Sequence, residues 1–190
     1  MTFDPEDVLT FWLDEEGPQS WYAGGEALDD RIRSRFEPAW EAARKGSLSS
    51  WRKRARSALA LLLLTDQFSR NMFRGTAKAF ATDAIARSVA RQAIDAGFDR
   101  DIAEPARQFF YLPLEHSESL ADQARAVRLI MLHMDAPETL LHARAHRAII
   151  RQFGRFPFRN EALGRVTTAR EQAFLDGGAY GAVVRHLRAG

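Results

Sequence analysis

The segment at residues 64–71 places an acid, a base and two amides close together in the chain. Asp66 and Arg70 are four residues apart, so a helix carries them on one face, where they can pair. An exposed pair of this kind contributes about 0.2–0.5 kcal/mol to a helix and needs no further role. This pair follows a strongly apolar stretch, however, so we expect it to be partly buried. Buried charges need partners, which Gln67 and Asn71 can supply.

A second segment, residues 109–118, begins with aromatic side chains and ends with His116, Ser117 and Glu118. An apolar wall with a polar edge is typical of a ligand pocket. The three polar residues are adjacent, and adjacent residues of a helix or turn point in different directions, so they do not form a hydrolytic triad among themselves. A single histidine that acts as an acid, a base or a hydrogen-bond donor is the better hypothesis.

The third segment, residues 146–160, joins a helical stripe to an aromatic loop. His146 has the helical spacing of the apolar residues that follow it, so we expect it to face inward, where most histidines are hydrogen-bonded core residues rather than catalysts. The loop carries Arg155, Arg159 and Asn160 among phenylalanines and a proline. Arginines held in this way form a preorganised cradle for a carboxylate or a phosphate, although they can equally bind carbonyls at the end of the preceding helix.

Metal and cofactor chemistry find little support in the sequence. His142 and His146 are four residues apart and have the spacing to share an ion on one helix face. However, there is no His-Glu-x-x-His pattern, His142 lies off the inward stripe, and the chain contains no cysteine. We therefore predict no metal site and no cofactor. The lack of cysteine also excludes disulfides and thiol catalysis.

Helical periodicity runs through most of the chain and predicts the elements that position these residues. A helix from residue 48 to about residue 70 is apolar all round at residues 58–64, which is typical of an element buried on every side. Pro38 lies inside the preceding helical stretch and should kink or divide it. A later apolar stripe consists of Val127, Ile130, Met131 and Met134.

Capping residues mark several helix ends. Asp4 and Pro5 have the types expected at the cap and first position of an opening helix. Thr168 and Glu171 have the spacing of a capping box at the start of a late helix. No stretch alternates like a strand and no glycine-rich phosphate loop is present. The sequence therefore predicts an all-α fold of eight to nine helices.

Composition limits the class of protein further. A chain of 190 residues with 46% hydrophobic residues can bury a core as a single domain, residues 1–190. The formal net charge is only +2 and acidic residues alternate with basic ones, so we expect no nucleic-acid partner. The longest apolar run, residues 58–64, is far shorter than the roughly 20 residues that cross a bilayer. The acidic start of the chain is unlike a signal peptide, and we expect a cytoplasmic protein without membrane contacts.

Several short motifs together resemble a known family. They are residues 66–71, 74–76, 80–83, 110–118, 146 and 153–160, with Phe11, Trp12, Trp21, Asp29 and Phe36 near the start and Phe174 and Leu175 near the end. In these stretches the chain resembles a bacterial family without assigned activity, known as domain of unknown function 924. The resemblance implies a tetratricopeptide-like, right-handed superhelix of stacked antiparallel helix pairs, and no established reaction. Two positions depart from the family pattern: Phe158 stands where a histidine is usual and Ser69 where a proline is frequent. The first departure weakens any mechanism that needs an imidazole in the loop.

Three functions are compatible with these residues. The first is a binding protein whose arginine-lined pocket holds a small anion or a peptide carboxylate. The ligand-binding residues would be Gln67, Arg70, Asn71, Arg74, Arg155, Arg159 and Asn160. The second is an enzyme, for example a hydrolase, that uses acid and base groups of the same pocket. The candidate catalytic residues are Asp66, His116, Glu118 and His146. In the third, the polar side chains form a purely structural buried network that fixes how the helices cross.

Overall fold

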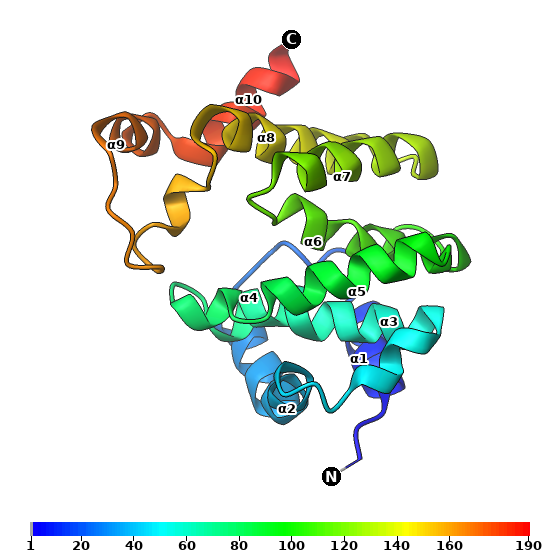
Figure 1. Ribbon diagram of the computed structural model, residues 1–190. Helices are drawn as coiled ribbons and strands as arrows, with labels where there is room; N and C mark the ends of the chain where they lie inside the picture. Colours follow the sequence, from blue (N-terminus) through cyan, green and yellow to red (C-terminus); the bar gives the residue numbers. More distant parts are fainter. Residues whose placement is uncertain (1) are drawn as a thin grey trace. The chain divides into compact units, whose positions relative to one another are not determined.

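The computed structural model describes residues 2–190 (Figure 1). Every regular element in this range is helical, which confirms the all-α class. The α-helices are α1 (Pro5–Leu9), α2 (Glu26–Arg44), α3 (Ala55–Leu62), α4 (Phe68–Met72), α5 (Asp83–Asp95), α6 (Leu112–Glu115), α7 (Leu120–His133), α8 (Pro137–Phe153), α9 (Ala169–Asp176) and α10 (Ala179–Ala189). Within residues 2–190, no helix has both the length and the apolar character needed to cross a bilayer.

The chain divides after Pro113 into two compact units. The N-terminal unit ends at Pro113 and contains α1 to α5; the C-terminal unit begins at Leu114 and contains α7 to α10. The single domain and the tetratricopeptide-like superhelix stay predictions.

Helix α3 forms the centre of the N-terminal unit. Residues 58–64 are all buried, as predicted for an element surrounded by others, and α3 packs against α1 and α5. The predicted start at residue 48 is wrong, because Ser49–Lys53 forms a separate 3-10 turn. Arg54 is then extended, with φ −142° and ψ 150°, and this conformation interrupts helical hydrogen bonding before Ala55.

A π-helical turn, Leu63–Gln67, joins α3 to α4. Its wider winding changes which side chains share a face, so the side chains on it no longer follow the spacing of a regular α-helix. The Thr65 hydroxyl donates a 2.7 Å hydrogen bond to the carbonyl of Leu61 within the buried part of the turn. Asp66 and Gln67 both lie on this turn, which therefore sets the direction of their side chains.

Helix α2 runs without a break through Pro38, so the prediction that this proline divides it is wrong. Pro38 has no N–H and cannot bond to the carbonyl of Ser34, but both residues are exposed, so water can replace the missing bond. The opposite face of α2 is buried, at Ile32, Phe36 and Trp40 among others, and packs against α4. Burial of that face holds the helix together across the proline.

Helices α7, α8 and α10 pack together in the C-terminal unit. A core of Ile149, Ile150 and Phe156 lies beneath partly buried aromatic side chains of α8, α9 and α10. In α7, Val127 and Ile130 are buried as predicted, but Met131 is 57% exposed and the prediction that it faces inward is wrong. The buried face includes the polar Asp122 and Gln123 of the first turn, which turns Met131 outward.

Local capping signals agree with the structure. The Asp4 side chain accepts a hydrogen bond from the Glu6 amide, and Pro5 opens α1. Thr168 and Glu171 form the predicted capping box at the start of α9. Each of these signals involves residues only two or three positions apart. They can therefore be predicted without knowledge of the tertiary packing, and the structure confirms them.

Candidate functional site

Arg70 is held on three sides within the N-terminal unit. Its Nη2 lies 3.5 Å from Asp66 Oδ1 and 2.8 Å from Asp83 Oδ1. Its Nη1 donates a hydrogen bond to the carbonyl of Ala79, and the guanidinium lies 4.7 Å from the centroid of the Phe80 ring. The predicted pair of Asp66 and Arg70 therefore exists, but Asp83 is the closer partner. These contacts tie α4 to the chain that leads into α5.

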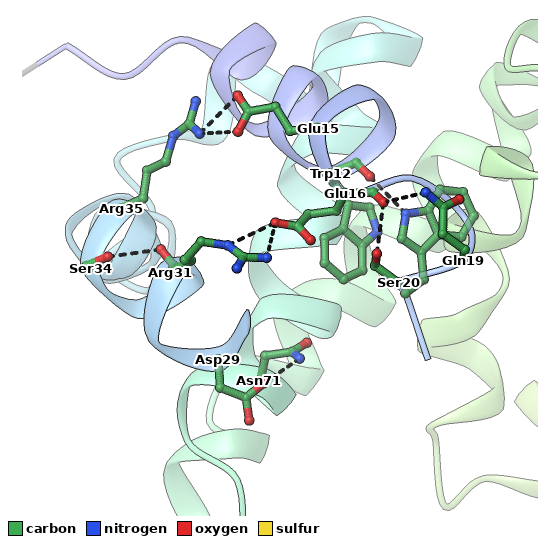
Figure 2. Close-up of polar contacts among 11 residues, drawn as sticks. Trp12, Glu15, Glu16, Gln19, Ser20, Asp29, Arg31, Ser34, Arg35 and Asn71 are labelled. Carbon is green, nitrogen blue, oxygen red and sulfur yellow. Dashed lines mark hydrogen bonds and ion pairs between the residues drawn. The ribbon is translucent and has the colours of Figure 1, made fainter. Parts of the chain in front are cut away.

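The two amides of the first segment lead to a carboxylate of α2, that of Asp29. Gln67 Nε2 donates to Asn71 Oδ1 at 3.0 Å. Asn71 Nδ2 donates to Asp29 Oδ1 at 2.8 Å (Figure 2). Asp29 lies in the first turn of α2 and is buried. Asn71 therefore supports Asp29 directly and Gln67 supports it through Asn71, while the role of these amides as partners of Asp66 stays a prediction.

Arg74 completes this chain of contacts. Its Nε lies 2.9 Å from Asp29 Oδ2 and its Nη2 lies 3.0 Å from Asp29 Oδ1, a two-pronged ion pair. Arg74 follows α4 in a turn where Gly75 has a φ of +77°, a conformation that other residues rarely adopt. The hydrogen bonds to Asp29 raise the pKa of Arg74, so the guanidinium keeps its charge. Gln67, Asn71, Asp29 and Arg74 form one continuous chain, which we call the Arg74 relay.

The outer edge of Arg74 is open to solvent. Its side chain is 59% exposed, and Nη1 takes part in none of the contacts described for residues 2–190. The guanidinium lines a groove of about 830 Å³ between the start of α2 and the turn after α4. The groove is lined by Gly24, Gly25, Glu26, Asp29, Asp30, Arg33, Asn71, Met72, Phe73, Arg74, Thr76 and Lys78. Arg74 thus offers two or more N–H groups to a ligand from an orientation that Asp29 fixes.

The other two cations of the groove have their own partners. Arg33 donates two hydrogen bonds to the Met72 carbonyl, at 3.1 and 2.7 Å, and lies 2.5 Å from Asp30 Oδ1. Lys78 Nζ lies 2.8 Å from Glu37 Oε1 and also lies over the Phe73 ring. Arg33 therefore joins α2 to the end of α4, and Arg74 is the cation of this groove with an open edge.

Glu118 organises the loop of the C-terminal unit. It accepts a 3.0 Å hydrogen bond from the Phe156 amide and pairs through both oxygens with Arg165, at 2.8 and 2.9 Å. Burial would raise the pKa of Glu118, but the hydrogen bonds from Arg165 and the Phe156 amide outweigh it and lower the pKa. Glu118 is therefore a carboxylate at neutral pH, and its contacts are those of a residue that holds the loop.

His146 lies beside a carboxylate to which sequence reasoning assigned no role. Its Nδ1 is 3.6 Å from Oε2 of Glu115, which is 1% exposed. The rings of His116 and Tyr180 lie 5.9 and 4.8 Å from the His146 ring. Burial lowers the pKa of His146, although Glu115 acts in the opposite direction. The structure thus brings together two of the candidate catalytic residues, His116 and His146, and adds Glu115.

His142, one of the two histidines of α8, contacts Tyr180. His142 Nδ1 lies 2.5 Å from the Tyr180 hydroxyl, which occupies the nitrogen on that side. Among residues 2–190, no three histidine, aspartate or glutamate side chains come together in an arrangement that could hold a metal ion.

The arginines of the loop are engaged with the C-terminal unit itself. Arg155 Nε and Nη2 lie 2.6 and 2.8 Å from the oxygens of Glu171, and the pairing lowers the pKa of that carboxyl. Arg159 is buried, with its guanidinium 4.4 Å from the centroid of the Phe156 ring. Asn160 Nδ2 donates to the Thr167 hydroxyl at 3.2 Å. Arg155 therefore anchors the loop to the capping box of α9.

The predicted site residues thus fall into both units. Gln67, Arg70, Asn71 and Arg74, with Asp66, belong to the N-terminal unit. The remaining predicted residues, which belong to the C-terminal unit, are His116, Glu118, His146, Arg155, Arg159 and Asn160. That the three segments share one site stays a prediction.

Comparisons with known proteins identify the family. Residues 8–179 match a family described as bacterial protein of unknown function (DUF924). A solved structure of a protein of unknown function from Agrobacterium tumefaciens is 43% identical to this chain, with a TM-score of 0.86. The similarity covers 91% of this chain and 97% of that one. No functionally curated protein matches the chain. The chain therefore belongs to the DUF924 family of bacterial proteins of unknown function.

Proposed function

We propose that the N-terminal unit is a binding module that takes a ligand carboxylate on the open edge of Arg74. One observation carries this proposal: Asp29 holds one edge of the guanidinium, while the Arg74 side chain is 59% exposed and lines a groove of about 830 Å³. Guanidinium N–H groups lie in one plane and match the two oxygens of a carboxylate. A guanidinium that is already oriented loses little conformational entropy on binding, which favours affinity.

The rest of the Arg74 relay acts as a set of positioning residues. Asn71 donates to Asp29, and Gln67 donates to Asn71, so each side chain fixes the next. Supporting hydrogen bonds of this kind keep a binding group within the narrow range of geometry that recognition needs. This arrangement gives Gln67 and Asn71 indirect roles, and Arg74 the direct one.

Other predicted binding residues favour the structural hypothesis. Arg70 is held by Asp66, Asp83 and the Ala79 carbonyl, and Arg155 is held by Glu171. Donors that are engaged in this way must break existing bonds to take a ligand. We propose that these two arginines fix how their segments pack.

A second candidate function is acid and base chemistry in the C-terminal unit. It is favoured by the 3.6 Å approach of His146 to Glu115, because burial lowers the pKa of His146 and leaves a neutral base at neutral pH. A panel of ester, amide and phosphoester substrates tests this candidate. Turnover that is lost in His146→Gln and kept in His142→Gln would support it, and turnover unchanged by His146→Gln, or absent throughout, would reject it.

Calorimetric titration with N-acetylglycine tests the binding proposal, with N-acetylglycinamide as the uncharged probe. We expect saturable binding of the acid, no binding of the amide, and loss of binding in Arg74→Gln. Arg31→Gln is a matched control, because the Arg31 side chain is 55% exposed and pairs with Glu16, whose side chain is 10% exposed (Figure 2). The corresponding side-chain values are 59% for Arg74 and 10% for Asp29. Equal loss of binding in both variants, or equal binding of acid and amide, would contradict the proposal.

A further inference from the structure

The groove that Arg74 lines contains one carboxylate without an ion pair. Three acidic and three basic side chains line this groove. Asp29 pairs with Arg74 at 2.9 Å, and Asp30 Oδ1 lies 2.5 Å from Arg33 Nη1. The third carboxylate, that of Glu26, is exposed and takes part in no ion pair or hydrogen bond described for residues 2–190.

The remaining cation of the groove is engaged away from Glu26. Lys78 Nζ lies 2.8 Å from Glu37 Oε1 and 3.7 Å from Glu41 Oε1. Glu41 in turn pairs with Arg44 at 3.0 Å, so the charges at that end of α2 balance one another. Glu26 is therefore the acidic position of the groove at which a positively charged group of a ligand finds an uncompensated partner.

Glu26 lies one helical turn from the carboxylate that holds Arg74. It is the first residue of α2, and Asp29 follows three positions later on the same helix. Side chains with this spacing are neighbours on a helix face, about 5–6 Å apart at their Cβ atoms. Gly24 and Gly25 also line the groove, and a Cβ at either glycine would meet no atom of residues 2–190 within 4 Å. The space beside Glu26 is therefore open to a ligand.

Building on the proposed function, we propose that the ligand is a small α-amino acid that binds as a zwitterion. Its carboxylate lies on the open edge of Arg74 and its ammonium group lies at Glu26. One carbon joins the two charged groups of an α-amino acid, so their nitrogen and oxygen atoms are about 3 Å apart. With a hydrogen bond of about 2.8 Å at each end, the molecule bridges about 8–9 Å. This span suits two long side chains that meet at neighbouring turns of α2.

The charges of the groove favour a zwitterion over a simple anion. A simple anion at Arg74 meets the negative charge of Glu26, which no ion pair described for residues 2–190 offsets. A zwitterion places its ammonium group there and turns this repulsion into an attraction. The other charges that line the groove are already paired, so we expect the side chain of the amino acid to be neutral.

Calorimetric titration with four small molecules tests the inference. Glycine carries both charges, N-acetylglycine only the carboxylate, glycinamide only the ammonium group, and N-acetylglycinamide neither. We expect glycine to bind most tightly, about fivefold more tightly than N-acetylglycine, which is the upper end for an exposed ion pair. N,N-dimethylglycine keeps the positive charge with a bulk near that of an acetyl group, and it should keep most of this gain.

Variants of the protein assign the gain to Glu26. Glu26→Gln should bind glycine and N-acetylglycine with similar affinity, because it removes the charge that distinguishes the two. Asp7→Asn is the matched control, because Asp7 is also exposed in the first turn of a helix, α1, but does not line the groove. This control should keep the fivefold preference for glycine, and Arg74→Gln should lose binding of both molecules.

The outcomes separate this inference from the proposed function. If N-acetylglycine binds at Arg74 but glycine binds no more tightly, the amino-acid inference is wrong and the carboxylate site stands. If Glu26→Gln keeps the full preference for glycine, or Asp7→Asn loses it, the inference is also wrong. If neither glycine nor N-acetylglycine binds, both the proposed function and the inference fall.

Discussion

At the scale of a single residue, the surroundings of an arginine decide what it binds. Arg74 and Arg31 are similarly exposed, at 59% and 55%, and each pairs with a carboxylate that is 10% exposed. Arg74 lines the groove, and its partner Asp29 is also held by Asn71. Arg31 pairs with Glu16 outside the groove. The two arginines therefore differ in preorganisation and position rather than in charge.

Asp29→Asn tests whether Asp29 orients Arg74 or competes with the ligand for it. The variant keeps the size of the side chain but removes the charge that binds the guanidinium. If Asp29 orients Arg74, N-acetylglycine should bind about three- to tenfold more weakly, although Asp29 contacts no ligand. Calorimetry measures the change. Tighter binding in the variant would show that Asp29 is a competitor and that the Arg74 relay has no positioning role.

His146 should make stability depend on pH near neutrality. Its pKa is lowered from the ordinary value of 6.5 by burial, so below about pH 6.5 the unfolded chain takes up protons that the folded protein does not. The free energy of unfolding should thus be constant above this pH and fall as the pH drops through it. Chemical denaturation at a series of pH values measures the slope. His146→Gln should flatten it, and a slope that persists in this variant would contradict the assignment.

Part of the Arg74 relay can be predicted from the sequence, and part cannot. Gln67, Asn71 and Arg74 stand out because amides and a base follow one another at helical spacing after an apolar stretch. Asp29 has no such signal, because it lies 42 positions before Asn71 and meets it only through the packing of α2 on α4. Glu115 is hidden for a similar reason, because its contact with His146 joins two helices. Local spacing reveals the donors, and tertiary packing decides what they bind.

At the scale of the helices, local patterns can again be predicted from the sequence, while the effects of tertiary packing cannot. Caps and apolar stripes predict the helices well, because hydrogen bonds and burial repeat with a fixed period. The π-helical turn at Leu63–Gln67 and the 3-10 turn at Ser49–Lys53 have no periodic signature, and the sequence predicts one continuous helix instead. Pro38 has the opposite effect. Its local signal is strong, but burial of the far face of α2 overrides it.

Pro38→Ala should make the protein more stable. Alanine supplies the N–H that bonds to the Ser34 carbonyl and has the highest helix propensity, so unfolding should require about 1–3 kcal/mol more. Urea denaturation of the two proteins measures the difference. An unchanged or lower stability would mean that α2 is adapted to the proline and that the Ser34 carbonyl already has a partner.

Thr168→Ala should loosen the start of α9. The threonine hydroxyl accepts a hydrogen bond from the Glu171 amide at 3.2 Å, and its loss should cost about 0.5–2 kcal/mol. Amide hydrogen exchange should become faster in the first turn of α9, and Thr168→Ser should restore protection. If the amides of the first turn of α9 exchange at the same rate in Thr168→Ala and in the original protein, the contact of Glu171 with Arg155 alone holds this turn.

At the scale of the whole molecule, paired carboxylates should set the response to acid. Hydrogen bonds from Arg56 and Arg155 lower the pKa of Glu6 and Glu171, one in each unit, below the ordinary value of 4.5. A carboxyl with a lowered pKa stabilises the fold fully above pH 4.5, and this contribution is lost as the pH falls below that value. Thermal unfolding between neutral pH and about pH 3 should show the midpoint falling mainly below pH 4.5. Arg155→Gln should reduce that acid-dependent part, and an identical profile would contradict the assignment.

The charge of the whole chain also bears on its ligands. With 27 basic and 25 acidic residues, the net charge of +2 gives no strong field to attract anions from a distance. Recognition must therefore come from local arrangement, and in the N-terminal unit that arrangement is the Arg74 relay and the groove that Arg74 lines.

Nuclear magnetic resonance of the arginine side chains tests the central claim most directly. In protein labelled with 15N, the Nε and Nη resonances of Arg74 can be assigned by comparison with Arg74→Lys and followed as N-acetylglycine is added. We predict that these resonances shift and saturate with the acid and stay in place with N-acetylglycinamide, while those of Arg31 do not move. Saturating shifts elsewhere in the protein, with Arg74 unchanged, would contradict the claim that Arg74 binds the carboxylate.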